Sequence, residues 1–278
     1  IDPGVETIMR RTVPARSAIL IYNPFHTFAA DLPLGRLRYA FTFAGREGGM
    51  TTAVEVDPIQ YRQAVSLRLP LAGRILVYDG HDFYAHHRRV NTEHPLFKQA
   101  GFTTNPERYG HDLSLVDGAG RMYRGDGKRN EDWLSWGAPI LAPAAGRIVA
   151  VENGMPDYDV GTPGGGIPLD SLLVRPASLM GNYVIVDHGG GMFSRMLHMQ
   201  RGSVLVRVGQ RVVQGQPVGK VGFSGSVSTV HLHYEIGSGP AIDSEGLPAY
   251  FTGFRRVVGS TSRVEASGPI NSGDIVER

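Results

Sequence analysis

The sequence is most informative at one short stretch, Val230-His231-Leu232-His233-Tyr234-Glu235-Ile236. We interpret this stretch as a β-strand. Side chains two residues apart on a strand point to the same face, so His231 and His233 are expected to project together, about 6–7 Å apart along the backbone. Two imidazoles placed in this way allow one to bind a metal ion while the other acts beside it.

Short apolar or alternating stretches recur along the rest of the chain, separated by turns that carry Gly, Pro and Asp. This spacing predicts an antiparallel β protein. The chain has 278 residues, of which 37 are glycine and 18 are proline, and such a composition favours dense turns over long helices. The stretches expected to form strands are Ser17–Tyr22, Arg36–Phe43, Met50–Val56, Ala64–Leu69, Arg74–Tyr78, Leu113–Val116, Pro139–Leu141, Gly146–Glu152, Asn182–Val186, Met192–Met199, Arg211–Val213, Val218–Val221 and His231–Ile236.

The positions of these stretches predict an all-β chain with two domains. We expect a small N-terminal β domain over residues 1–72, a groove-forming antiparallel β domain over residues 73–255 and a polar C-terminal tail over residues 256–278. The segment 153–180 is rich in Gly, Pro and Asp, and we expect it to wall the groove and to set specificity, because loops carry much of the binding function in such architectures.

Composition and charge exclude several classes of protein. The net charge of +2, from 28 basic and 26 acidic residues, is too balanced for a nucleic-acid binder, which should carry a basic stripe. No run of about 18 apolar residues is present, so no membrane-spanning segment is expected. The absence of cysteine excludes disulfides, thiolate zinc sites and a cysteine nucleophile. The opening Ile1-Asp2-Pro3-Gly4 resembles a processed or cloned start, which is compatible with a removed signal peptide.

A metal site in this chain must therefore use His, Asp and Glu. His198 lies in a probable strand and adds a third imidazole to His231 and His233. Asp112 leads into the strand-like stretch Leu113–Val116 and offers a carboxylate. Two histidines and one aspartate leave an open position for water in a tetrahedral zinc site.

Several blocks between Trp136 and Ile236 occur in a characteristic order. They are Gly137–Ala150, Gly181–Gly189, Met196–Met199, Val208–Gly222, Ser224-Gly225 and His231–Glu235. Together these blocks resemble the catalytic domain of lysostaphin/LytM-type zinc metallopeptidases, which cut peptide cross-bridges in bacterial cell walls. With Asp112 included, the resemblance covers about 125 residues, nearly half of the chain.

The resemblance assigns roles to individual residues. It implies that His233 and Asp112 are zinc ligands and that His231 and His198 are the catalytic histidines. Asn182 is a candidate for orienting the substrate.

One ligand departs from the family's usual His-x-x-x-Asp pattern, because Arg108 stands four residues before Asp112 and arginine cannot bind zinc. Some relatives place the histidine farther upstream, where His86 and His87 are available. Adjacent residues of an extended chain point in opposite directions, so we expect one of the two to reach the metal, and we favour His86. His94 remains an alternative.

The expected function is that of a zinc metalloendopeptidase acting on peptidoglycan peptides in the cell envelope or outside the cell. The alternative is a non-catalytic module of the same fold that binds the cell wall or activates a partner hydrolase, because Arg108 replaces the usual ligand. A third interpretation, a carbohydrate-binding or biotinyl-type carrier module suggested by the Val- and Gly-rich hairpin, leaves the histidines unexplained.

Overall fold

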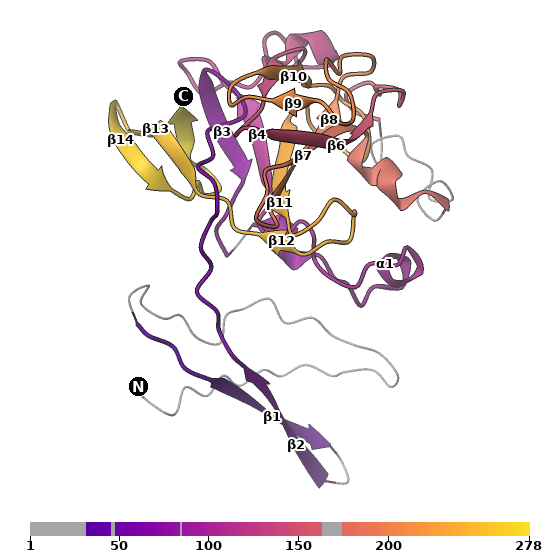
Figure 1. Ribbon diagram of the computed structural model, residues 1–278, viewed down its shortest axis with the longest axis vertical. Helices are drawn as coiled ribbons and strands as arrows, with labels where there is room; N and C mark the ends of the chain where they lie inside the picture. The colour runs from indigo at the N-terminus through magenta and orange to yellow at the C-terminus, as the bar shows by residue number, and fades with distance from the viewer. Residues whose placement is uncertain (1–31, 46–47, 84, 163–173) are drawn as a thin grey trace. The chain divides into compact units, whose positions relative to one another are not determined.

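The computed structural model describes residues 32–45, 48–83, 85–162 and 174–278 (Figure 1). The chain divides into two compact units, Ile1–Arg62 and Gln63–Arg278. The expected strand Ser17–Tyr22 and part of the segment predicted to wall the groove lie outside the described residues.

The first unit contains a two-stranded antiparallel ribbon. Strand β1 (Leu37–Gly45) pairs along its whole length with β2 (Gly48–Val56). Both strands lie close to the stretches expected from the sequence. Alternation places the side chains of Leu37, Tyr39 and Phe41 on one face of the ribbon, and the unit holds none of the predicted site residues.

The second unit is built on one large antiparallel sheet. Its strands follow an order that differs from their order in the chain, so segments far apart in sequence become neighbours. The strands, from one edge to the other, are β14 (Thr261–Gly268), β13 (Phe251–Val258), β15 (Ile275–Glu277), β3 (Arg74–Asp79), β4 (His111–Leu115), β11 (Leu232–Gly237), β8 (Phe193–Met199), β7 (Asn182–Asp187), β6 (Gly146–Glu152) and β9 (Arg211–Val212), and β12 (Gly246–Leu247) also pairs with β11.

Helix is scarce in the described part of the chain. No helix there is long and apolar enough to cross a membrane. The fold is antiparallel β almost throughout, which confirms the predicted fold class. The remaining elements are the separate strand pair β5 (Pro139–Leu141) and β10 (Pro217–Lys220), the short helix α1 (Pro95–Gln99) and the 3-10 turns η1 (His86–Arg89), η2 (Asn130–Asp132) and η4 (Pro176–Met180).

The hydrophobic core packs against the middle of the sheet, where β4 and β11 are buried on both faces. Leu232, Tyr234 and Ile236 project from β11 into this core and are fully buried. Burying an aliphatic side chain of this size contributes about 1.5–3 kcal/mol to folding. Because side chains alternate along a strand, His233 and Glu235 lie on the other face of β11. The core thus fixes the strand that carries the polar residues of the site.

Residues 256–278, which we expected to form a tail, continue the sheet. They complete β13 and form β14 and β15, and β15 pairs with β3 so that Ile275 lies opposite Leu76. The side chains of β14 are mostly exposed, which explains why this stretch resembles a polar tail. The expected strand Ala64–Leu69 does not form; its Leu67 makes only an isolated bridge to Phe251.

Candidate active site

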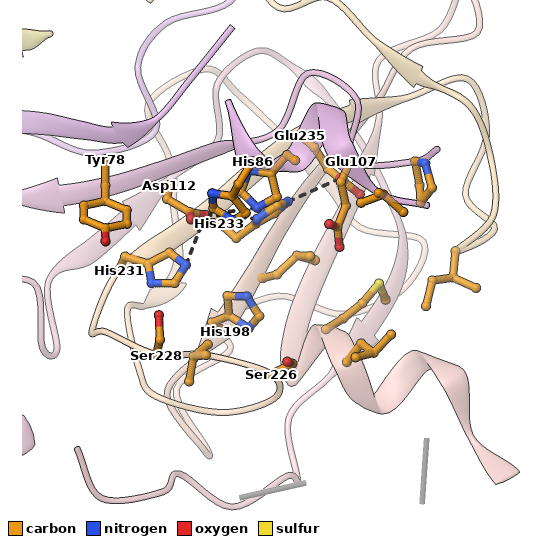
Figure 2. A pocket seen from close by; sticks show the side chains of 18 of the residues that line it. Tyr78, His86, Glu107, Asp112, His198, Ser226, Ser228, His231, His233 and Glu235 are labelled. Carbon is orange, nitrogen blue, oxygen red and sulfur yellow. Dashed lines mark hydrogen bonds and ion pairs between the residues drawn. The ribbon is translucent and has the colours of Figure 1, made fainter. Parts of the chain in front are cut away.

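Four of the predicted site residues come together around three neighbouring strands, β4, β11 and β8; they are Asp112, His198, His231 and His233. His233 of β11 lies directly opposite Asp112 of β4. On its other side β11 pairs with β8, which carries His198 near its end. His231 immediately precedes β11. Figure 2 shows these side chains around one pocket, with His86 beside them.

Donor atoms of His87, Asp112 and His233 converge at this point, all within 4.8 Å of one another. The distance from Asp112 Oδ1 to His233 Nδ1 is 3.1 Å, and that to His87 Nε2 is 3.7 Å. All three residues are buried. Two imidazole nitrogens and one carboxylate oxygen form a donor set that suits zinc and leaves a position open for a small ligand. The residues present therefore fit a zinc ion.

The turn η1 distinguishes His87 from His86. The His87 side chain is buried, whereas that of His86 is 61% exposed and its Nε2 lies 3.9 Å from Asp112 Oδ2. Because the backbone is turned here rather than extended, the two rings lie on the same side, with centroids 3.9 Å apart. The structure thus places His87, and not the favoured His86, in the donor cluster. His94 lies against Phe97 and does not line the pocket.

His231 and His198 lie beside the donor cluster, with ring centroids 5.2 Å apart. His231 Nδ1 donates to the carbonyl oxygen of Thr229 at 2.8 Å, and His198 Nδ1 donates to that of Ser224 at 2.9 Å. Because a carbonyl oxygen can only accept, these bonds hold a proton on Nδ1 of each ring, and in His198 they leave Nε2 as an acceptor. His231 Nε2 lies 3.1 Å from Asp112 Oδ1, at the edge of the cluster.

The backbone of His198 is unusual. Its φ of 61° is the only positive value among the non-glycine residues that the structure describes. Leu197 is paired with His233, so their side chains share a face of the sheet. Regular alternation would therefore place the side chain of His198 on the other face, away from His233. The pairing of β8 with β7 is irregular near this point, and both Leu197 and His198 line the pocket. Such a conformation costs about 1–3 kcal/mol, and strain of this kind clusters at functional sites.

The electrostatics of the cluster favour a positive charge beside its carboxylates. Burial opposes ionisation of Asp112, but the neighbouring His231 and His87 hold its pKa well below the usual range. Burial also disfavours the charged form of His233, yet hydrogen bonds to two carboxylates raise its pKa well above 6.5. His198 behaves differently, because burial and the adjacent histidines keep its pKa well below 6.5. It is therefore neutral at pH 7.

The structure does not support a substrate-binding role for Asn182. Its side chain is fully buried and does not line the pocket. Its Oδ1 accepts the N–H of Met155 at 2.8 Å, and its Nδ2 donates to the carbonyl oxygens of Met155 and Met199 at 2.8 and 3.1 Å. Both amide hydrogens are used in this way, so Asn182 ties the segment after β6 to β7 and β8 instead of contacting a ligand.

The pocket has a volume of about 260 Å³ and includes residues that we had not singled out. Glu235 follows His233 by two residues, so strand alternation alone could have placed the two on one face. Asp79, at the end of β3, does not line the pocket but contacts His87, and no sequence motif connects these two residues. An apolar wall completes the pocket, formed by Phe97, Phe102, Leu179, Met180, Leu197 and Ile242.

Comparison with known proteins identifies a family for part of the chain. Residues 133–244 match the family model of Peptidase family M23. The matched segment contains His198, His231 and His233, whereas Asp112 and His87 precede it. The histidine-bearing strands thus lie within a recognised peptidase domain, and the rest of the donor cluster comes from chain outside the match.

The share of each relative that matches this chain varies. The chain is 38% identical over 96 residues to the peptidoglycan DD-endopeptidase ShyA of Vibrio cholerae. The aligned region covers 34% of this chain and 20% of ShyA. It is 30% identical over 102 residues to the lipoprotein NlpD of Yersinia enterocolitica, and that aligned region covers 37% of this chain and 79% of NlpD. The solved catalytic domain of lysostaphin from Staphylococcus simulans gives a TM-score of 0.31 at 22% identity, covering 50% of this chain and 74% of that domain.

The match to the family model defines residues 133–244 as a peptidase-type domain. The chain belongs to peptidase family M23. It spans about a fifth of the length of ShyA.

Proposed function

We propose that the protein is a zinc-dependent endopeptidase that hydrolyses peptide cross-links of bacterial peptidoglycan. The observation that carries the proposal is the convergence of His87, Asp112 and His233, with their donor atoms within 4.8 Å, beside His231 and His198. The substrate class is supported by the 38% identity to ShyA, which is named a peptidoglycan DD-endopeptidase. The function requires access to the cell wall, so we place the protein in the cell envelope or outside the cell.

Each side chain of the site has a role in this reaction. His87, Asp112 and His233 hold the metal. When bound, zinc polarises the carbonyl of the scissile peptide and lowers the pKa of a water molecule towards neutrality. His198 presents an unprotonated Nε2 that would accept a proton from the attacking water and pass it to the leaving amine as the C–N bond breaks, and His231 would stabilise the developing oxyanion. The low pKa of His198 keeps it in the neutral form that this role needs.

Arg108 does not weaken the proposal. Its guanidinium pairs with Glu245 at 2.7 Å, and its side chain is 47% exposed. His87, which lies on η1 with its Nε2 facing Asp112, would take the ligand role of the histidine that the usual pattern has in place of Arg108. The donor set is therefore complete without a histidine four residues before Asp112.

The test combines metal analysis with a digestion. Protein purified without chelators should contain about one zinc ion per chain, and it should release new fragments from purified peptidoglycan, identified by mass spectrometry. The His231→Ala variant is the control for the digestion, because it should keep zinc and release no fragments. Protein that binds zinc and peptidoglycan but cuts nothing would instead be a binding or activating module. Absence of zinc from the wild type would refute the enzyme.

A further inference from the structure

We propose that Asp79 and Glu235 are positioning residues, which orient the imidazoles of His87 and His233 so that both present one chosen nitrogen to a shared metal ion. This inference rests on the proposed function, because it assumes that the cluster binds zinc. Neither carboxylate belongs to the three-residue donor cluster around Asp112. Each contacts the ring nitrogen on the far edge of a proposed ligand.

Asp79 holds His87 from the side opposite Asp112. Its Oδ2 lies 2.6 Å from His87 Nδ1 and accepts the backbone N–H of the same residue at 3.2 Å. Its Oδ1 accepts the backbone N–H of His86 at 2.9 Å and lies 3.2 Å from that residue's Nδ1. The contact at His87 Nδ1 is an ion pair and not an aligned hydrogen bond. The negative charge of an ionised carboxylate nevertheless favours the proton on that nitrogen. The other nitrogen, Nε2, then faces Asp112 without a proton, as a metal ligand must.

Glu235 acts on His233 in the same way, but at the other ring nitrogen. Its Oε2 lies 3.3 Å from His233 Nε2, whereas His233 Nδ1 faces Asp112 Oδ1 at 3.1 Å. Figure 2 shows the contact between Glu235 and His233. The two residues share one face of β11, so the strand itself sets their spacing. Both ring nitrogens of His233 therefore face a carboxylate. A metal ion shared with Asp112 would replace the proton on Nδ1, whereas the contact with Glu235 keeps the proton on Nε2.

Arg195 keeps Glu235 in place. It lies opposite Glu235 on β8, is fully buried, and donates from Nη1 to Glu235 Oε1 at 2.8 Å. Its Nη2 donates to the carbonyl oxygens of Gly239, at 3.0 Å, and Ala241. One oxygen of Glu235 binds Arg195 and the other contacts His233 at the ring nitrogen that does not face Asp112, so the carboxylate lies outside the donor cluster. The pair therefore fixes a ring orientation and does not add a ligand.

The inference predicts a specific loss of metal affinity. Removing an outer carboxylate of this kind weakens metal binding by about 10- to 100-fold, because the freed imidazole can turn or carry its proton on the wrong nitrogen. We therefore expect Asp79→Asn and Glu235→Gln each to raise the zinc dissociation constant by that factor, measured by competition with a chromophoric chelator. The visible absorption bands of the cobalt(II)-substituted protein should also shift, since they report the geometry of the ligands.

Matched controls separate this role from a general effect on folding. Asp82→Asn changes a nearby carboxylate that accepts the N–H of Ser272, and Glu245→Gln breaks the surface pair with Arg108. Both should leave zinc affinity and the cobalt spectrum close to wild type. Because Glu235→Gln leaves Arg195 buried without a counter-charge, the double variant Arg195→Gln/Glu235→Gln is measured beside it, and the Asp79→Asn protein decides if neither folds.

The outcomes are distinguishable from failure of the proposed function. Wild-type protein that takes up no zinc would refute the enzyme itself. If the wild type binds zinc, and Asp79→Asn and the Glu235 variants have the same zinc affinity and the same cobalt spectra as the wild type, the positioning role alone would be refuted. A loss of affinity confined to these variants, at an unaltered melting temperature of the metal-free protein, would support it.

Discussion

At the scale of single residues, His86 and His87 have the same chemistry and differ in burial. The His87 side chain is 6% exposed and that of His86 is 61% exposed. We predict that His87→Ala reduces bound zinc to a small fraction of the wild-type content, whereas His86→Ala retains most of it. Metal analysis of the two purified variants checks this, and the reverse result would move the ligand assignment to His86.

His231 and His198 are predicted to affect turnover without affecting metal content. Replacing either by alanine removes a group that accepts a proton or stabilises the oxyanion, and such losses cost about 10²–10⁴ in rate. Zinc should remain bound, because His87, Asp112 and His233 are untouched. Initial rates on purified peptidoglycan, with metal content measured on the same samples, test this, and zinc loss in His231→Ala would indicate that it is a ligand.

Sequence reasoning reached only part of the residue-level picture. Strand alternation predicted that His231 and His233 lie together, and both line the pocket, although β11 begins only at Leu232. The sequence favoured His86 over His87, whereas the structure places His87 beside Asp112 and His233. The difference arises from a 3-10 turn that no sequence motif indicates. His198 faces the pocket only through a left-handed backbone, which breaks the alternation rule. Local rules thus predict sites on regular strands and fail where the backbone departs from them.

At the scale of elements, the junction between η4 and β7 depends on Gly181. Its φ is 64°, and a Cβ there would lie 2.3 Å from the carbonyl oxygen of Ser224, which accepts the hydrogen bond from His198. Gly181→Ala should therefore lose more than about 1 kcal/mol of unfolding free energy and also reduce activity. Gly189→Ala is the matched control, because its φ is 80° but a Cβ there meets nothing within 4 Å. Urea unfolding of both variants should rank Gly181→Ala as the less stable.

Strand β4 contains a buried titratable group, His111, whose two ring nitrogens have no hydrogen-bond partner in the described part of the chain. Burial, with a smaller effect of nearby histidines, lowers its pKa to about 3 from the ordinary 6.5. The unfolded chain therefore binds this proton at a higher pH than the folded one. Stability present above pH 6.5 should be lost as the pH falls towards 3.

At pH 5 this loss amounts to about 2 kcal/mol, because each unit of pH between the two pKa values is worth about 1.4 kcal/mol. His111→Phe keeps a flat ring beside Phe251 but removes the titration. Its unfolding free energy should fall less between pH 7 and pH 5 than that of the wild type. Equal falls in the two proteins would show that His111 is not the group responsible.

Whole elements were easier to predict than single contacts. Strands such as β6 (Gly146–Glu152) were expected with their observed bounds, because apolar stretches between turn residues are sufficient signals. Strand β14 was missed because it is an edge strand that buries little and needs few apolar residues. Strand β15 lies between β13 and β3 but has only three residues, too few to form a pattern. The order of the strands was not predictable at all, since pairing depends on tertiary packing that no local pattern encodes.

At the scale of the whole molecule, the division into two units suggests that the second can stand alone. All proposed ligands and the core around them lie within Gln63–Arg278. We predict that a chain beginning at Gln63 folds cooperatively and binds zinc with the affinity of the full chain. Calorimetry and zinc titration of the shortened chain test this. Weaker zinc binding would assign residues before Gln63 a part in the site.

The strand order also has a consequence for when the donor cluster can assemble during synthesis. Asp112 and His233 are 121 residues apart in sequence, and β11 inserts between β4 and β8, both of which leave the ribosome before it. A nascent chain therefore has no complete set of ligands until β11 has emerged and paired with both neighbours. Because metal affinity depends on that long-range pairing, zinc capture should be a late step of maturation, and fragments that end before β11 should remain metal-free.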